Sequence, residues 1–123
     1  MSNVKNTITD SEYTIMKILW KSDKKMTVSE VVGALDGNDW TPSTVSTFLQ
    51  RLLKKNVMPC EKNGNTNLYY QILKQNDYDM SETERFLSKI YKGSVKNLVA
   101  ALYENKKLSK EDTSELKDMF DLE

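Results

Sequence analysis

The chain has 123 residues, of which 38% are hydrophobic and 29% charged, and its 18 basic and 18 acidic side chains balance to a net charge of zero. This size suits one compact domain or a small domain with an appendage, and no apolar run approaches the ~18 residues that a membrane span requires. The absence of histidine removes Ser-His-Asp triads, Cys-His pairs and HExxH zinc sites, so we expect no enzyme, no cofactor and no metal.

The charges are distributed slightly unevenly. Residues 1–75 carry ten basic and seven acidic side chains, whereas residues 76–123 carry eight and eleven. This small bias favours a front half that meets a polyanion. The first residues, MSNVKNTITDSEY, lack a basic start followed by a hydrophobic stretch, so no signal peptide is expected. The single cysteine, Cys60, fits a reducing compartment, and the expected location is the cytoplasm.

Two capping boxes mark the first two predicted helices. Residues 9–12 (TDSE) precede the first and residues 27–30 (TVSE) open the second. Gly37 follows the second helix and is expected to stop it. The apolar face of the first helix is predicted to hold Tyr13, Met16, Leu19 and Trp20, and that of the second Val31, Val32 and Leu35.

A third helix is predicted from its start signal and its periodicity. Thr41 fits the N-cap and Pro42 the first helical position, where the missing N–H costs nothing. The helix is expected to run to about Lys55. Its apolar stripe, at the i, i+3, i+4, i+7 spacing, consists of Val45, Phe48, Leu49, Leu52 and Leu53.

The pattern changes to strand, turn and strand after Asn56. VMPCEK and TNLYYQI flank an Asn63-Gly64 hairpin signal. Pro59 cannot donate to a sheet ladder and suggests an edge or a bulge. On the second strand, one face is expected to carry Leu68, Tyr70 and Ile72.

The last third of the chain reads as a linker and two or three helices. QNDYD at residues 75–79 is predicted as the linker, residues 81–84 (SETE) as a third capping box, and Ser109 as the start of the last helix. The apolar residues at helical spacing, which we expect to form a dimerisation surface, are Phe86, Ile90, Val95, Leu98, Val99, Leu102, Leu116, Met119 and Phe120.

This order of elements predicts a mainly α fold with a small β-hairpin. Three helices followed by a hairpin form a winged helix-turn-helix, which we assign to residues 1–75, and residues 76–123 form a helical dimerisation region. About 48 residues rarely enclose a core of their own. We therefore expect these helices to pack against a partner, most simply a second copy of the chain.

The outer face of the third helix favours DNA binding. It carries no acid from residue 41 to residue 55. Arg51, Lys54 and Lys55 are expected to neutralise phosphates, while Thr41, Thr44 and the backbone N–H groups at the helix start are expected to hold one. Base contacts are expected from Ser43, Ser46, Thr47 and Gln50, and wing contacts from Lys62, Asn63 and Asn65.

Two alternatives remain open at this point. The helix is an ordinary surface helix if Thr47 is simply solvated and Arg51 pairs with a nearby acid. The fold serves as a protein–protein interaction module if it does not bind DNA, although such a surface would be expected to expose aromatic residues or methionine. The face in question exposes hydroxyls, glutamine and positive charge instead.

Several motifs resemble those of the BlaI/MecI family of bacterial penicillinase and methicillin-resistance repressors. They are SEYTIMKILW, WTPSTV, RLLKK, the wing ending in YY, KIYKGSVKNLVAALYEN and LSKEDTSELK, which together span nearly the whole chain. The resemblance implies a homodimeric repressor that occupies a palindromic double-stranded DNA operator of a β-lactamase or penicillin-binding-protein gene. It also implies release by cleavage in the dimerisation region, triggered by a membrane sensor-protease that detects β-lactam.

The chain departs from the family pattern at three places. The penicillinase repressors resemble WSPKT at the helix start and carry a basic or amide residue three positions after that lysine, where this chain has Ser43 and Ser46. A different operator sequence or affinity is therefore expected. The position of the family's Asn-Phe cleavage pair is taken by Ala101-Leu102, which leaves a signal other than β-lactam as an alternative. Copper-responsive relatives end in a cysteine cluster, whereas this chain has only Cys60, so copper sensing of that kind is not expected.

Overall fold

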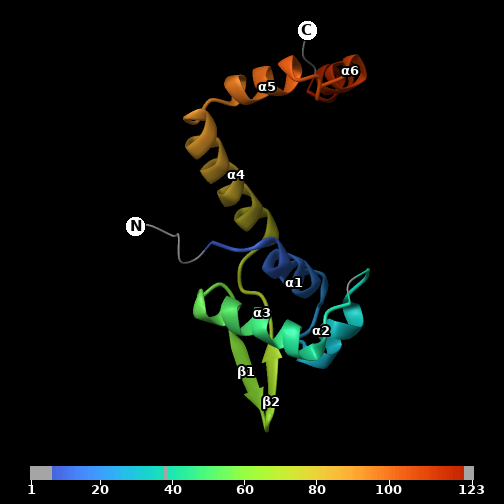
Figure 1. Ribbon diagram of the computed structural model, residues 1–123, viewed down its shortest axis with the longest axis vertical. Helices are drawn as coiled ribbons and strands as arrows, with labels where there is room; N and C mark the ends of the chain where they lie inside the picture. Colours follow the sequence, from blue (N-terminus) through green and yellow to red (C-terminus); the bar gives the residue numbers. More distant parts are fainter. Residues whose placement is uncertain (1–6, 38, 121–123) are drawn as a thin grey trace. The chain divides into compact units, whose positions relative to one another are not determined.

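The computed structural model describes residues 7–37 and 39–120, and it divides the chain into two units, residues 1–78 and 79–123. The described residues form six helices and one two-stranded antiparallel hairpin (Figure 1). In chain order the elements are α1 (Asp10–Lys21), α2 (Val28–Ala34), α3 (Pro42–Lys54), β1 (Cys60–Asn63), β2 (Thr66–Tyr69), α4 (Gln75–Tyr91), α5 (Val95–Glu104) and α6 (Lys110–Met119). Three helices and a hairpin in this order make the first unit a winged helix, as predicted.

The predicted helix starts in the first unit are confirmed. Thr9 caps α1 by accepting from the backbone N–H of Glu12 at 3.1 Å, and the Glu12 carboxylate accepts from the Thr9 N–H at 3.0 Å. Thr41 caps α3 by accepting from the N–H of Thr44 at 3.2 Å, and Pro42 is the first helical residue. These caps satisfy backbone donors that a helix leaves unpaired at its start.

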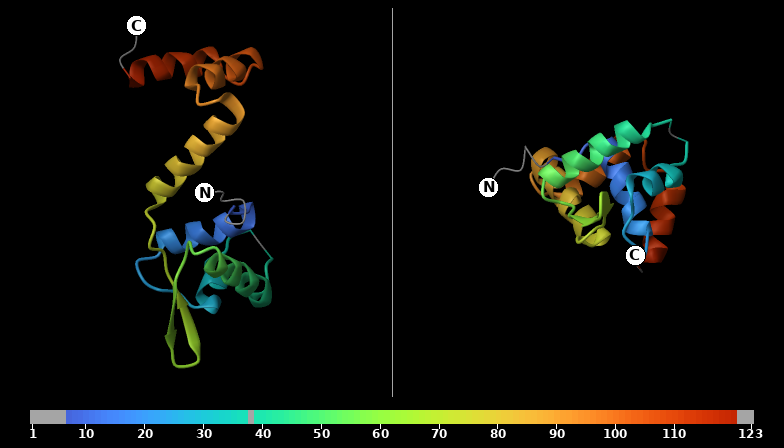
Figure 2. Two further views of the ribbon diagram at one scale, coloured as in Figure 1. Left: turned by 90° about the vertical axis from the view of Figure 1, so that its left-hand side faces the viewer. Right: turned by 90° about the horizontal axis from the view of Figure 1, so that it is seen from below.

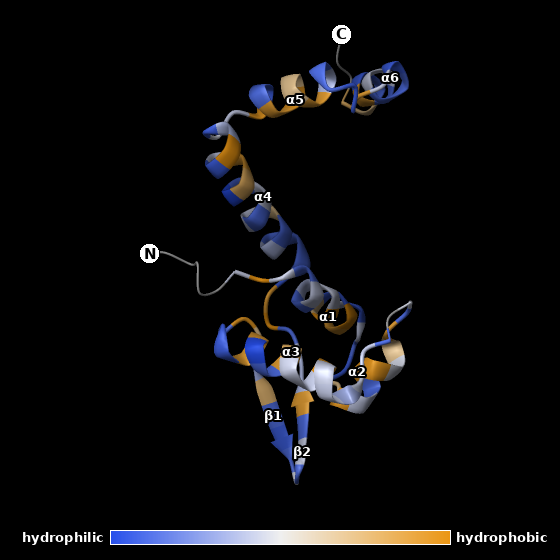
Figure 3. Ribbon diagram, in the orientation of Figure 1, coloured by the Kyte–Doolittle hydropathy of each residue, from blue (hydrophilic) through white to orange (hydrophobic). Residues whose placement is uncertain are grey.

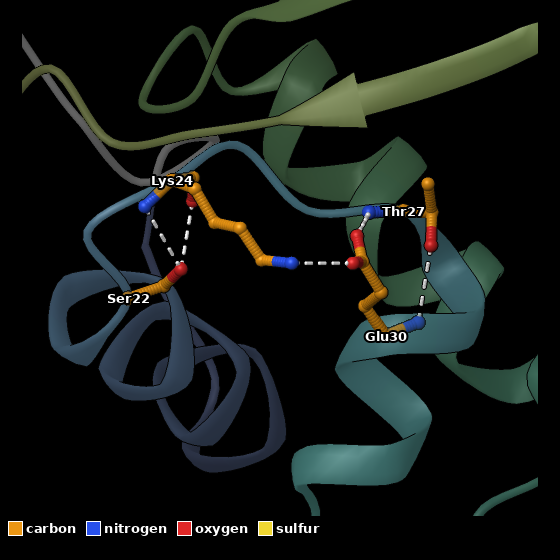
Figure 4. Close-up of polar contacts among 4 residues, drawn as sticks. All are labelled: Ser22, Lys24, Thr27 and Glu30. Carbon is orange, nitrogen blue, oxygen red and sulfur yellow. Dashed lines mark hydrogen bonds and ion pairs between the residues drawn. The ribbon is translucent and has the colours of Figure 1, made fainter.

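The turn between α1 and α2 is fixed by a compact set of polar contacts (Figure 4). Thr27 and Glu30 form the second capping box, with N–H to oxygen distances of 2.9 and 3.1 Å. Lys24 extends across the turn to the other Glu30 oxygen at 2.8 Å, and the Ser22 hydroxyl bonds both the N–H and the carbonyl of Lys24. The orientation of α2, which precedes α3, is therefore set by local hydrogen bonds.

The prediction that Gly37 stops the second helix was wrong. The helix α2 already ends at Ala34, and Leu35 is its C-cap in an extended conformation. Gly37 lies beyond the cap, in the loop that leads to α3. It adopts a φ of +77°, a conformation that glycine accepts without strain.

One hydrophobic core lies among α1, α2, α3 and the base of the hairpin. The buried apolar residues are Ile15, Met16, Leu19, Met26, Val31, Val45, Leu49, Leu52, Met58 and Tyr69. Each such side chain contributes about 1.5–3 kcal/mol when fully buried. Burying the inner stripe of α3 in this core leaves its opposite face on the surface.

The hairpin extends away from the three helices (Figures 1 and 2). Its register pairs Cys60 with Tyr69 and Asn63 with Thr66, so the turn is formed by Gly64 and Asn65. Gly64 has a φ of +68° and Asn65 does not have a positive φ, which is the pattern of a type II′ turn. The turn therefore lies one residue later than the Asn-Gly signal indicated. Pro59 directly precedes β1 and does not interrupt the ladder.

The second strand ends at Tyr69, so of the three residues predicted on one of its faces only Leu68 lies within it. Tyr69 is 1% exposed and belongs to the core, whereas Ile72 is 64% exposed and lies beyond the strand. Backbone hydrogen bonds with Met26, at 2.9 and 2.7 Å, place Tyr69 in the core. Because side chains alternate along a strand, this pairing turns Leu68 and Tyr70 away from the centre of the core.

The predicted linker at residues 75–79 is also wrong, because α4 begins at Gln75 and continues through Ser81 without a break. The first turn of α4 is held by aromatic contacts rather than by a cap at Ser81. The Tyr78 ring stacks on Tyr13 at 6.0 Å and lies 5.8 Å from Trp20, whose indole N–H donates to the Leu73 carbonyl at 2.9 Å. These contacts make the segment up to residue 78 part of the first unit.

The second unit leaves its apolar side chains exposed. None of α4, α5 and α6 contains a buried residue, although each is amphipathic (Figure 3). The larger apolar side chains with more than a third of their surface exposed are Met80, Phe86, Ile90, Val95, Val99, Leu102, Tyr103, Leu116, Met119 and Phe120. Ser94 caps α5, and Ser109 forms a capping box with Asp112 at the start of α6, as predicted for Ser109.

Candidate nucleic-acid interface

The exposed face of α3 consists of polar and basic side chains. Ser43, Thr47, Gln50, Arg51 and Lys54 are exposed, and Thr44 and Ser46 are half-buried. The buried stripe of Val45, Leu49 and Leu52 fixes which way this face points. The helix carries no acid, so its surface charge comes from Arg51 and Lys54 alone.

The hydroxyl groups at the start of α3 are partly used within the helix. The Thr41 oxygen caps the Thr44 N–H, and the Thr41 hydroxyl donates to the Thr44 hydroxyl oxygen at 3.1 Å. The Thr47 hydroxyl donates to the Ser43 carbonyl at 3.1 Å. Thr44 can still donate its own proton outward, while Thr47 presents its oxygen as an acceptor.

Arg51 lies against an aromatic pair. Its guanidinium carbon lies 5.9 Å from the centre of the Phe48 ring, which packs edge-on against Trp40 at 5.0 Å. Among the residues that the structure describes, no carboxylate lies within ion-pair distance of Arg51, Lys54 or Lys62. The alternative in which Arg51 pairs with a nearby acid is therefore not found in this part of the chain.

Lys55 was predicted to contact phosphate, but the structure pairs it with a buried acid. Its ammonium group lies 2.5 Å from Glu12 Oε1 and 2.8 Å from the Thr7 carbonyl, and only 17% of its side chain is exposed. The Glu12 side chain is 1% exposed, and its second oxygen is buried without a hydrogen-bond partner among the described residues. A buried carboxylate requires a compensating charge, so Lys55 serves the core and not the surface.

The interaction with Lys55 changes the pKa of Glu12. Burial raises the pKa of the Glu12 carboxyl, but the hydrogen bonds from Lys55 and Thr9 and the charge of Lys55 outweigh burial. The pKa of Glu12 therefore lies below its ordinary value, and the charged form is the stable one.

The hairpin places its predicted contact residues at its far end. Lys62, Asn63 and Asn65 are all exposed. The only acid of the hairpin, Glu61, is paired with Lys25 at 2.6 Å, and Lys25 also lies 4.5 Å from the centre of the Tyr70 ring. The far end of the hairpin therefore presents two amides and one lysine that has no acidic partner within residues 7–37 and 39–120.

A polar link that periodicity did not reveal joins α3 to the hairpin. The buried Tyr69 hydroxyl oxygen accepts from Gln50 Nε2 at 3.3 Å and from Asn67 Nδ2 at 3.4 Å. The sequence carried a partial signal, since Asn67 and Tyr69 are two residues apart and so lie on one face of β2. Their contact with Gln50 depends on how the hairpin packs against α3.

Other kinds of site have less support in the residues that the structure describes. No three His, Cys, Asp or Glu side chains there gather closely enough to hold a metal ion. None of the described helices combines the length and the apolar character needed to cross a bilayer.

Known proteins of one kind resemble this chain along most of its length. The family model for penicillinase repressors matches residues 8–121. A penicillinase repressor of Bacillus licheniformis is 33% identical over 110 residues, which cover 89% of this chain and 85% of that protein. The methicillin resistance regulatory protein MecI of Staphylococcus aureus is 28% identical over 120 residues, 97% of each chain. The solution structure of the DNA-binding domain of the repressor BlaI has a TM-score of 0.51 and 32% identity, covering 59% of this chain and 89% of that one.

Proposed function

This chain belongs to the penicillinase repressor family, and on that premise we propose that it represses transcription in the cytoplasm by binding double-stranded DNA through α3 and the β1–β2 hairpin. The observation that carries the proposal is the exposed face of α3, which has hydroxyls, an amide and two basic side chains but no acid. Phosphates attract such a face, and a helix of this kind fits the major groove.

The side chains of this surface divide by chemistry. Arg51, Lys54 and Lys62 have no acidic partner among the described residues and would neutralise phosphates. Thr41 and Thr44 at the helix start would position a phosphate together with backbone N–H groups. The side chains that would contact base edges are Ser43, Ser46, Thr47 and Gln50. The hairpin would add contacts from Asn63 and Asn65, next to Lys62.

We further propose that α4, α5 and α6 join two copies of the chain. Val95, Leu98, Val99 and Leu102 form an apolar stripe along one face of α5 at helical spacing. None of these side chains is buried. Covering these side chains with the same helices of a second copy removes them from water. A two-fold dimer would present two α3 helices to the two halves of a palindromic operator.

Inactivation would follow a cut in the same region, at Ala101-Leu102. The Ala101 carbonyl accepts from both the backbone N–H and the side-chain amide of Asn105, at 3.1 and 2.8 Å. A membrane sensor-protease would have to open this turn of α5 before cleaving it. The cut would separate Leu102 and all of α6 from the rest of the dimerisation surface, and the gene released would be that of a β-lactamase or a related resistance protein.

Arg51→Ala is the first test of the DNA surface. The variant is expected to bind all duplexes about tenfold or more weakly, because a charge-assisted phosphate contact is lost. The slope of log affinity against log salt is expected to fall by about one. Fluorescence anisotropy titrations at several salt concentrations measure both quantities.

Lys21→Ala is the matched control, since Lys21 is an exposed lysine on α1, outside α3 and the hairpin. It is expected to leave the affinity and the salt slope close to those of the wild type. Equal effects of the two substitutions, or no effect of Arg51→Ala, would show that α3 does not meet the DNA backbone.

A further inference from the structure

Tyr69 combines a buried ring with a hydroxyl that reaches the proposed DNA surface. The residue is 1% exposed, and its backbone carbonyl and N–H are both hydrogen-bonded to Met26, at 2.9 and 2.7 Å. Its hydroxyl lies where α3 meets β2 and accepts from the amides of Gln50 and Asn67. Because the ring is fixed in the core, the position of the hydroxyl is fixed as well.

The Gln50 amide turns its nitrogen toward the Tyr69 hydroxyl. A buried hydroxyl requires hydrogen-bond partners, and the oxygen of Tyr69 has two lone pairs for the two amide donors. With Nε2 turned toward Tyr69, the carbonyl oxygen of Gln50 points in a different direction on an exposed side chain. No residue in the described part of the chain donates to that carbonyl oxygen. Gln50 therefore presents its carbonyl oxygen as an acceptor in a direction that the contact with Tyr69 favours, and the second N–H of Nε2 remains beside it as a donor.

We propose that Tyr69 is a positioning residue for base recognition, and that it holds Gln50 so that α3 selects a base with an exocyclic amino group in the major groove. Adenine N6 and cytosine N4 are the two donors of that kind. Guanine O6 and thymine O4 are acceptors and would face the Gln50 carbonyl with like polarity. This inference rests on the proposed function, in which α3 enters the major groove.

The same hydroxyl also ties the recognition surface to the wing. Asn67 pairs with Lys62 across the hairpin, and its amide shares the Tyr69 oxygen with Gln50. The hairpin, through Asn67, and α3, through Gln50, are thus both hydrogen-bonded to the Tyr69 hydroxyl oxygen. Removing that atom is expected to loosen the base reader while leaving the charged phosphate contacts in place.

The test is a selection from duplexes that contain about 30 randomised base pairs, about three helical turns, followed by sequencing of the bound fraction. The proteins are the full-length wild type, Tyr69→Phe, Gln50→Ala and the double variant. Tyr70→Phe is the matched control, because it removes a neighbouring hydroxyl that does not contact Gln50. Thermal unfolding of each variant verifies that it is folded, and Gln50→Ala, at an exposed position, keeps the test decisive if Tyr69→Phe is unstable.

The wild type and Tyr70→Phe are expected to select adenine or cytosine at one position of each half-site. Tyr69→Phe and Gln50→Ala are each expected to lower that preference about fivefold or more, and the double variant should lose no more than either single variant. The preferences at other positions and the salt slope should stay unchanged, which a general loss of stability would not produce.

Two results would overturn the inference while leaving the proposed function intact. One is a base preference in Tyr69→Phe equal to that of the wild type, and the other is an unchanged preference in Gln50→Ala. Failure of the wild type to enrich any sequence would contradict the proposed function itself, and this inference with it.

Discussion

Leu102→Asp is expected to give a monomer that binds the operator at least ~10²-fold more weakly than the wild type. Leu102 lies on the apolar stripe of α5, and a carboxylate placed in a covered apolar surface loses its hydration without gaining a partner. The second unit contains no buried residue among residues 79–120, and the proposed dimer would cover its apolar side chains. Once the two copies separate, each half-site loses the gain that comes from tethering.

Sedimentation velocity measures the mass, and anisotropy with a two-half-site duplex measures the affinity. Asn97→Asp is the matched control, because it adds the same charge to an exposed polar position of the same helix. It is expected to remain a dimer with wild-type affinity. A dimer that persists in Leu102→Asp would place the contact between copies elsewhere.

Lys55→Met is expected to lower the free energy of unfolding by about 3 kcal/mol, the lower end of the range for breaking a buried ion pair. The lower end applies because Lys55 keeps 17% of its side chain exposed, whereas Glu12 keeps 1%. The substitution preserves the apolar stem but leaves the Glu12 carboxylate buried without its charge partner. Urea unfolding followed by circular dichroism measures the difference. Lys54→Met, next in sequence but exposed, should change stability by less than about 0.5 kcal/mol.

The same pair predicts how stability depends on pH. The folded pKa of Glu12 is lowered, so the pair stabilises the fold above the unfolded pKa, and this contribution is lost as the pH falls through the folded value. The wild type is therefore expected to lose stability on acidification below about pH 4.5, and Lys55→Met to lose less over the same interval. Parallel curves for the two proteins would contradict the assignment of the pair.

Local signals accounted for much of the fold. The caps at Thr9, Thr27 and Thr41 were predictable because each is completed within three residues of the chain. The outer face of α3 was predictable for the same reason, since helical periodicity separates it from the buried stripe of Val45 and Leu49.

The errors arose where distant residues decide the structure. QNDYD is polar and reads as a linker, yet Tyr78 packs against Tyr13 and Trp20 and draws the segment into α4. Tyr69 is buried because Met26 pairs with it, which no pattern within β2 reveals.

The candidate site was affected in the same way. Lys55 continues the basic end of α3, but its partner Glu12 is 43 residues away in sequence. Gln50 was predicted as a base reader from its place on the helix, while its link to Tyr69 required the hairpin to be folded against α3. Local sequence thus predicted which residues lie on the surface, and tertiary packing determined which of them are free to act.

In the proposed function, this chain recognises a specific operator through α3 and the hairpin. Fluorescence anisotropy at two salt concentrations, with the DNA upstream of its own gene and with a scrambled duplex of equal length, tests it most directly. A specific repressor is expected to prefer the upstream DNA by ~10³-fold or more at physiological salt. Equal and steeply salt-dependent affinity for the two duplexes, or no binding to either, would contradict it.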